Sequence, residues 1–283
     1  MARPLTWLDV FTSTPMTGNP VAVVHEADDL DGDTMRAFAR ETNLSETTFV
    51  QTPTEPGADY RNRIWMPHRE LDFAGHPSLG TAVAVAWRRG EREAGYVQQT
   101  RAGLQPIDVR FDGDVARASM LQGATTFGDE LDVAEALGVV GLGPDDADPE
   151  LPSQVVSTGQ PQALVFVRDA ERLGDIRADA ETLDRYLESV GGLVLYLAAV
   201  GEDGEVRARG LFVSHGDVRE DPATGAAAGA LMGHLHAHAG ADRCSISQGV
   251  EMGRPSRLEC AIEGDRVRVG GDVVLLAEGE IAL

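Results

Sequence analysis

The spacing of apolar residues along this chain changes from helical to strand-like at two places. Apolar positions recur every three or four residues over 33–44, "DTMRAFARETNL", and the strand-like run "TTFVQT" follows. The same order returns over 181–190, "ETLDRYLESV", which is followed by "GLVLYLAA". The pattern predicts two surface helices, each with one buried stripe and each followed by a strand.

Three further segments of the first half resemble segments of the second half, in the same order. The pairs are "GNPVAVV" (18–24) with "GQPQALVFV" (159–167), "HPSLGTAVA" (76–84) with "DPATGAAAG" (221–229), and "DGDVARA" (112–118) with "EGDRVRV" (263–269). We therefore predict two copies of one plan, each about a domain long. Chance similarity is the alternative, and three ordered matches make it the weaker one.

A second helix is predicted in each half after a His-Pro or Asp-Pro step. Proline fits the first helical position because no N–H is needed there. Pro77 and Pro222 are therefore predicted to begin the helices, with His76 and Asp221 at the N-caps. Gly90, after two arginines, is predicted to end the first of these helices.

The second of these helices carries Gly225, Gly229 and Gly233 at four-residue spacing, with alanine at many of the other positions. An interior glycine costs a helix about 1 kcal/mol relative to alanine. The stripe therefore predicts a backbone packed closely against its surroundings, as in a thin apolar helix threaded through a curled sheet.

The start of each helix offers backbone N–H groups and a positive dipole end. If the two halves face each other, they form one anion-binding cleft flanked by an imidazole and a carboxylate. Asp221 alone could be an ordinary N-cap, but histidine is a poor cap by residue type. The position of His76 therefore points to another role.

Composition places limits on location and partners. The chain has 283 residues, of which 42% are hydrophobic, enough for one large domain or two ordinary ones. The sequence contains neither a signal-peptide pattern nor a long apolar run, so we expect a cytoplasmic protein. The two cysteines, Cys244 and Cys260, are expected to be reduced, with a disulfide as the less favoured alternative.

The net charge of the chain further limits the classes of partner that it can bind. There are 46 acidic and 24 basic residues, giving a net charge of −22, and every basic residue is arginine. This balance argues against nucleic acid and anionic membranes as partners. Because halophilic proteins use such acidic surfaces to stay soluble, a salt-loving source is one hypothesis.

A metal site is one alternative for the segment "GHLHAHAG", where His234 and His238 lie four residues apart and could share a helix face. Polar residues that close a helix before Gly240 are the commoner explanation. No carboxylate or cysteine stands at ligand spacing beside these histidines, so no metal is expected. We find neither a phosphate loop nor a dinucleotide-binding fingerprint, so no cofactor is expected.

Five segments together resemble one known family. They are "DVFTSTPMTGNPVAVV" (9–24), "TNLSETTFV" (42–50), "RIWMPHRELDFAGHPSLGTA" (63–82), "REDPATGAAAGAL" (219–231) and "QGVEMGRPS" (248–256). They resemble the PhzF-like phenazine-biosynthesis proteins, which have the diaminopimelate-epimerase-like fold. The resemblance covers nearly the whole chain.

The resemblance implies an α+β fold with two pseudo-symmetric halves. Each half is a β-barrel-like sheet wrapped around a central helix, and the active site lies between the halves. The N-terminal half would span 1–117, completed by the final strand 272–283, and the C-terminal half 118–271. Family members often form homodimers, which we expect here as well.

The resemblance also implies a cofactor-free isomerase that acts on a small cyclic or unsaturated carboxylic acid. The named member of the family isomerises trans-2,3-dihydro-3-hydroxyanthranilate. Carried onto this chain, Glu46 is the acid/base that moves the proton, and His76 and Asp221 support it. A carboxylate suits this work when an apolar cleft shifts its proton affinity toward the working pH.

The predicted substrate-binding residues lie at the helix starts and in the preceding segments. They are Asn19, Ser45, Gly75, Gly80, Gly225 and Ala226. Family members commonly carry serine where this chain has Ala226, which puts the identity of the substrate in question. Epimerases of this fold carry a cysteine at each helix start, a place that His76 and Asp221 take here, so a two-thiol racemase is not expected. A non-catalytic protein that binds small acids is the alternative function.

Overall fold

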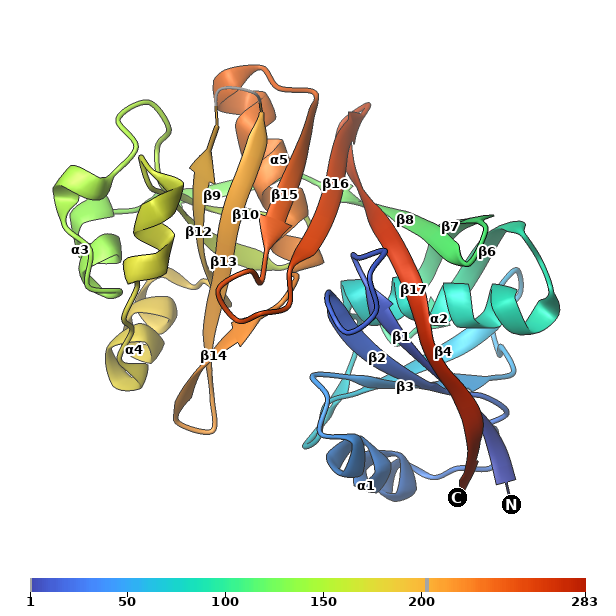
Figure 1. Cartoon of the computed structure of the whole chain (residues 1–283). Coiled ribbons are helices and arrows are strands. Elements are labelled where there is room, and N and C mark those ends of the chain that lie inside the picture. Colours follow the sequence, from blue (N-terminus) through green and yellow to red (C-terminus); the bar gives the residue numbers. More distant parts are fainter. Residues whose placement is uncertain (1, 202–203) are drawn as a thin grey trace. The chain divides into compact units, whose positions relative to one another are not determined.

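The structure is a computed structural model that describes residues 2–201 and 204–283. The chain divides into two compact units, of which unit 1 comprises Met1–Met120 and Gly270–Leu283 and unit 2 comprises Leu121–Val269. Both combine a strongly curled sheet with a few helices, which confirms the predicted α+β class (Figure 1).

Unit 1 is a closed barrel of eight strands. In order around the barrel these are β1 (Ala2–Val10), β2 (Asn19–Val24), β3 (Thr47–Gln51), β4 (Tyr60–Trp65), β6 (Glu93–Thr100), β7 (Gly103–Asp112), β8 (Val115–Ala124) and β17 (Arg266–Ala282). The barrel closes because β17 pairs with both β8 and β1. A short strand, β5 (Glu70–Leu71), pairs with β4.

Helix α2 (Gly75–Arg89) is the central helix of unit 1. Every residue from His76 to Ala86 is buried, whereas a helix on a surface would keep one exposed face. Gly80 allows close contact with the barrel wall, because a Cβ there would lie 2.5 Å from Val21 Cγ1. The helix ends at Gly90, which has the left-handed conformation predicted for it.

Helix α1 (Gly32–Thr42) covers the outside of unit 1, as its apolar spacing predicted. Its buried residues Met35 and Ala39 pack in one cluster with Phe49 and Trp65. The helix begins where Asp31 accepts a hydrogen bond from the Thr34 N–H at 2.8 Å.

Unit 2 repeats the strand order of unit 1. Its strands are β9 (Thr126–Glu130), β10 (Gln154–Ser157), β11 (Pro161–Phe166), β12 (Leu195–Val200), β13 (Glu205–Ser214), β14 (Asp217–Asp221), β15 (Arg243–Gln248) and β16 (Ser256–Glu263). The pairs β10–β11, β12–β13 and β15–β16 are antiparallel, and the pairs β11–β12 and β13–β15 are parallel. The corresponding pairs of unit 1 have the same directions: β1–β2, β3–β4 and β6–β7 are antiparallel, and β2–β3 and β4–β6 are parallel. The predicted internal repeat is therefore present in the strand pairing itself.

Helix α5 (Gly225–Ala239) is the central helix of unit 2 and packs against β10, β11, β15 and β16. Its glycine stripe has the close approach that the sequence predicted. A Cβ on Gly229 would lie 1.9 Å from Gln122 Oε1, and one on Gly233 would lie 2.2 Å from Thr125 Oγ1. The helix ends at Gly240 in the left-handed conformation.

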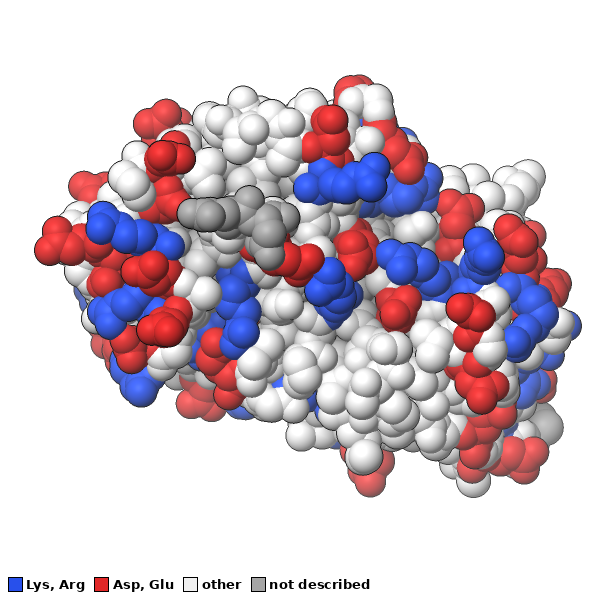
Figure 2. Space-filling view, turned by 45° about the horizontal axis from the view of Figure 1, so that its top comes forward, with Lys and Arg blue, Asp and Glu red and all other residues white. Residues whose placement is uncertain are grey.

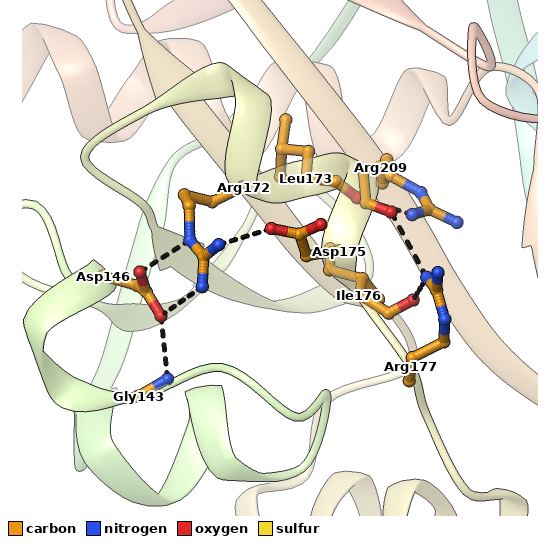
Figure 3. Close-up of polar contacts among 9 residues, drawn as sticks. Gly143, Asp146, Arg172, Leu173, Asp175, Ile176, Arg177 and Arg209 are labelled. Carbon is orange, nitrogen blue, oxygen red and sulfur yellow. Dashed lines mark hydrogen bonds and ion pairs between the residues drawn. The ribbon is translucent and has the colours of Figure 1, made fainter.

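Unit 2 also carries helix α3 (Val133–Gly138), helix α4 (Ala180–Val190) and two short 3₁₀ segments, η1 (Pro144–Asp146) and η2 (Ala170–Asp175). Arg172 holds η1 and η2 together, since its guanidinium binds Asp146 as well as Asp175 (Figure 3). Arg209 of β13 donates to the carbonyl of Leu173 at 2.6 Å and so fixes η2 to the sheet.

Acidic and basic side chains are interspersed on the surface. On the face drawn in Figure 2, arginine side chains (blue) have aspartate and glutamate side chains (red) beside them. Arg257, for example, pairs with both Glu205 and Glu259. Among the described residues, no helix is long and apolar enough to cross a membrane.

Candidate active site

The two central helices do not begin where the proline pattern predicted: α2 begins two residues earlier and α5 begins three residues later. Helix α2 has its N-cap at Ala74 and α5 has its N-cap at Thr224, so the assignment of His76 and Asp221 as N-caps was wrong. His76 is the second residue of α2, whereas Asp221 is the last residue of β14, where it pairs with Gly210. Strand pairing thus outweighed the local preference for an Asp-Pro helix start.

The first turn of α2 brings His76 to Glu46, which directly precedes β3. His76 Nε2 lies 3.6 Å from Glu46 Oε2, and both side chains are largely shielded from solvent, with 7% and 13% exposed. The distance is longer than a hydrogen bond. The structure therefore brings together two of the three residues predicted to handle protons.

Burial decides the charge of His76. Desolvation lowers the pKa of His76 from 6.5 to about 3, and a hydrogen bond from its ring to the Pro20 carbonyl opposes this shift only in part. The imidazole is therefore neutral at pH 7, and its contact with Glu46 is not an ion pair at that pH. The ring can accept or pass a proton without carrying a charge at rest.

The predicted binding residues of unit 1 occupy different kinds of position. Asn19 is fully buried at the start of β2, and Ser45 is exposed beside Glu46. Gly75 is the first residue of α2, so its N–H belongs to the turn that a helix leaves unpaired. Gly80 lies in the second turn, and the space beside it is filled by Val21.

In unit 2, Asp221 is half-buried at the end of β14, three residues before Thr224. The Thr224 hydroxyl donates a hydrogen bond to Asp221 Oδ2 at 2.8 Å. The next two residues, Gly225 and Ala226, form the first turn of α5 and offer N–H groups there.

Each central helix is preceded by the same partly buried ion pair, which the sequence analysis missed. Arg63 of β4 binds both carboxylate oxygens of Glu70 in β5, and Arg209 of β13 binds both oxygens of Glu220 in β14. The second pair has contacts of 3.0 and 2.7 Å. A possible sequence signal was an arginine seven or eleven residues before a glutamate just ahead of each Gly-started helix.

Other reactive residues lie elsewhere in unit 2. Cys244 and Cys260 are free, buried thiols on neighbouring strands β15 and β16. His234 is fully buried and stacks on Phe166 and His238, with ring centroids 4.7 and 4.2 Å away. Within the described part of the chain, no group of three or more His, Cys, Asp or Glu side chains is placed to hold a metal ion.

Comparison with known proteins gives a consistent result over the whole length. The sequence model of a family described as "Phenazine biosynthesis-like protein" (PhzC-PhzF) matches residues 8–279. The chain is 37% identical to trans-2,3-dihydro-3-hydroxyanthranilate isomerase of Pseudomonas aeruginosa and 36% identical to that of Pseudomonas chlororaphis. Each alignment covers 98% of both chains.

Solved structures agree with the fold. A predicted epimerase of Pseudomonas aeruginosa superposes with a TM-score of 0.85 at 33% identity, covering 99% of both chains. A hydroxyproline epimerase of Agrobacterium vitis superposes with a TM-score of 0.64 at 15% identity, covering 100% of this chain and 91% of the epimerase, and shows likeness of fold alone.

Proposed function

We propose, from the premise that this chain belongs to the phenazine biosynthesis-like PhzC-PhzF family and is an isomerase, that it moves a proton on a small cyclic or unsaturated carboxylic acid without a cofactor. The observation that carries the proposal is the shielded Glu46–His76 contact at the start of α2. The full-length similarity to isomerases named for a ring carboxylic acid supports the substrate class.

Glu46 is the proposed acid/base. It takes a proton from one carbon of the substrate, the electron pair shifts the double bond, and the proton returns to a second carbon. Substrate and product have the same oxidation level, so this step needs no electron acceptor. General acid–base catalysis of this kind accelerates a reaction by about 10²- to 10⁴-fold.

His76 is the proposed partner that sets where the proton rests. With its other ring nitrogen bonded to the Pro20 carbonyl, the neutral imidazole presents a lone pair at Nε2 toward Glu46. Two acceptors facing each other repel, so one proton between Glu46 and His76 stabilises the contact. A proton shared at this contact can be donated by Glu46 as well as accepted by it.

Asp221 and the helix starts complete the proposed site. Asp221 remains a predicted supporting group, and the N–H groups of Gly75, Gly225 and Ala226 are proposed to receive the substrate carboxylate. Anions bind at helix N-termini because unpaired N–H groups and the helix dipole favour negative charge there. Asn19 and Ser45 remain predicted contacts.

The test is proton exchange on a defined probe. Trans-2,3-dihydro-3-hydroxyanthranilate, incubated with the protein in D₂O, is expected to be isomerised and to take up deuterium from solvent, followed by NMR. Glu46→Gln is expected to lower the exchange rate by about 10²-fold or more. Glu41→Gln, the same change at an exposed residue of α1, is the matched control and should leave the rate unchanged.

Two outcomes would contradict the proposal. Binding of the probe and related ring acids without isomerisation or deuterium uptake would favour a binding protein. Equal loss of rate in the Glu46 and Glu41 variants would remove Glu46 from the reaction.

A cytoplasmic homodimer is also part of this proposal. The two free thiols of unit 2 support a reducing compartment. Sedimentation equilibrium is expected to give twice the chain mass of 30.1 kDa, and a monomer would contradict the dimer.

A further inference from the structure

The carboxylate of Asp221 is attached to a hydrogen-bond network whose centre is Gln248, the last residue of β15. The Gln248 side chain is fully buried and uses both ends of its amide. Its Oε1 accepts from the Tyr196 hydroxyl at 2.9 Å and from the Thr224 N–H at 3.1 Å. Its Nε2 donates to the Asp221 carbonyl at 2.8 Å and to Thr224 Oγ1 at 2.9 Å.

Two backbone groups fix the orientation of this amide. The Thr224 N–H can only donate, and the Asp221 carbonyl can only accept. A flipped amide would place a donor against the N–H and an acceptor against the carbonyl, so only one orientation satisfies both.

The fixed amide in turn fixes the direction of the Thr224 hydroxyl. Because Thr224 Oγ1 accepts from Gln248 Nε2, its own proton is directed to Asp221 Oδ2, 2.8 Å away. Thr224 is the N-cap of α5, yet in the described residues its side chain makes no capping hydrogen bond to the helix. The hydroxyl is therefore committed to Asp221.

Two glycines make room for the network. A Cβ on Gly210 would lie 2.9 Å from Thr224 Oγ1, 3.3 Å from Gln248 Nε2 and 3.4 Å from a ring carbon of Tyr196. Gly249, with φ +74°, follows Gln248 directly, and a Cβ there would lie 2.6 Å from the Pro222 carbonyl. The backbone around Asp221 is thus fitted to these side chains.

The network is absent from the matching place in unit 1. In unit 2, Tyr196 pairs with Gly210, and Gly210 pairs with Asp221. The matching residues of unit 1 are Thr48, Ile64 and Leu71, which pair in the same order. Unit 1 forms the same strand order although it has Thr48, Ile64 and Leu71 at these positions. The fold itself therefore does not require the network.

We propose that Gln248, Tyr196 and Thr224 are positioning residues that hold the Asp221 carboxylate in one orientation for the reaction. This inference rests on the proposed function, in which Asp221 supports proton transfer. The chain of donors runs from the Gln248 amide through the Thr224 hydroxyl to Asp221 Oδ2.

The first test compares variants at Thr224 on the probe trans-2,3-dihydro-3-hydroxyanthranilate. Thr224→Val removes the hydroxyl and keeps the shape, and it is expected to lower kcat about 10- to 100-fold, because misplacing a catalytic group by about 1 Å costs up to about 10²-fold. KM should change less than kcat. Thr224→Ser restores the donor and should restore kcat to within about threefold.

A second variant disturbs the network without removing a polar group. Gly210→Ala is expected to lower kcat in the same way, because the added methyl group displaces Thr224 and Gln248. Gly95→Ala on β6 is the matched control, since a Cβ there meets only the Asp108 carboxylate at 3.6 Å. Melting temperatures of all variants separate loss of fold from loss of positioning.

Crystal structures of the wild type, Thr224→Val and Thr224→Ser give a readout that does not depend on activity. We expect one Asp221 rotamer in the wild type and the serine variant, and a rotated or divided carboxylate in the valine variant. An unchanged Asp221 in Thr224→Val, or an unchanged kcat in an active enzyme, would overturn the inference. If the probe is not turned over but Asp221 rotates as expected, the proposed function fails on this probe while the positioning role stands.

Discussion

The starts of the two central helices share their supports but differ in their polar chemistry. In both units a partly buried arginine–glutamate pair joins the preceding strands, and the helix begins at a glycine, Gly75 or Gly225. The second helical residue is His76 in unit 1 and Ala226 in unit 2. The strand pairing that carries Asp221 in unit 2 carries Leu71 in unit 1.

The two units also differ in the residue that precedes β3 in unit 1 and β12 in unit 2. The registers of β3 and β12 place Glu46 and Val194 at matching positions, each directly before the strand. The repeat therefore preserves the groups that hold the helix starts and varies the groups that can exchange protons. A feature present in both units is best explained by the fold, whereas one present in a single unit is a candidate for function.

The largest expected effect comes from making the start of α2 resemble that of α5. His76→Ala gives both helices alanine at the second position and is expected to lower kcat about 10²-fold or more, because the partner of Glu46 is lost. His236→Ala, at an exposed residue near the end of α5, is the control. Equal rates for the two variants in the isomerisation assay would remove the distinction between the units.

Breaking the repeated ion pairs should show that these supports are structural in both units. Glu70→Gln and Glu220→Gln are each expected to lower the free energy of unfolding by about 2–4 kcal/mol, since removing one partner leaves a shielded arginine without its carboxylate. The loss should be larger for Glu70, which also binds Arg101. Urea unfolding measures both, and a loss below about 0.5 kcal/mol in either would show that the pair is dispensable.

Glycine-to-alanine changes test whether both helices are equally close to their sheets. Gly80→Ala, Gly229→Ala and Gly233→Ala are each expected to destabilise the protein by about 1–3 kcal/mol through overpacking. Gly138→Ala, where nothing lies within 4 Å of the added Cβ, should be neutral or slightly stabilising. A stabilised Gly229 variant would mean that Gln122 moves aside without cost.

The smallest expected effect is the pH response of His76 above pH 5. Because burial lowers the pKa of His76 to about 3, NMR of the ring should show no protonation between pH 8 and 5. In the unfolded chain the ring protonates near pH 6.5, so stability contributed by His76 is complete above that pH. It is lost as the pH falls from 6.5 toward 3, and His76→Ala should lack this part of the acid response. Titration of the folded protein near pH 6.5 would contradict the neutral imidazole.

The sequence predicted the elements that depend on local pattern. Helices α1 and α4 were found from buried positions such as Met35 and Leu183, and α2 and α5 end at the predicted glycines. The repeat of the strand plan was predicted from three ordered matches. These features could be predicted because the spacing of apolar residues and the conformation of glycine depend on only a few neighbouring residues. The match of 76–84 with 221–229 was wrong in register, because the helices begin at Gly75 and Gly225 and His76 therefore corresponds to Ala226.

The errors and omissions involve contacts between distant segments. Proline rules favoured His76 and Asp221 as N-caps, but pairing of β14 with β13 keeps Asp221 in a strand. Gln248 and Tyr196 reach the same carboxylate from separate strands, and no local pattern links them. The family resemblance supplied Glu46, which local pattern alone would describe as a loop residue.

Strand β17 has a consequence for the order in which the protein can be made and folded. Its first residues belong to unit 2, and its last residues close the barrel of unit 1 beside β1. During synthesis, the barrel of unit 1 therefore cannot close when its first 120 residues have been made. Strands β1 and β8 lack their pairing with β17 until that last strand has left the ribosome.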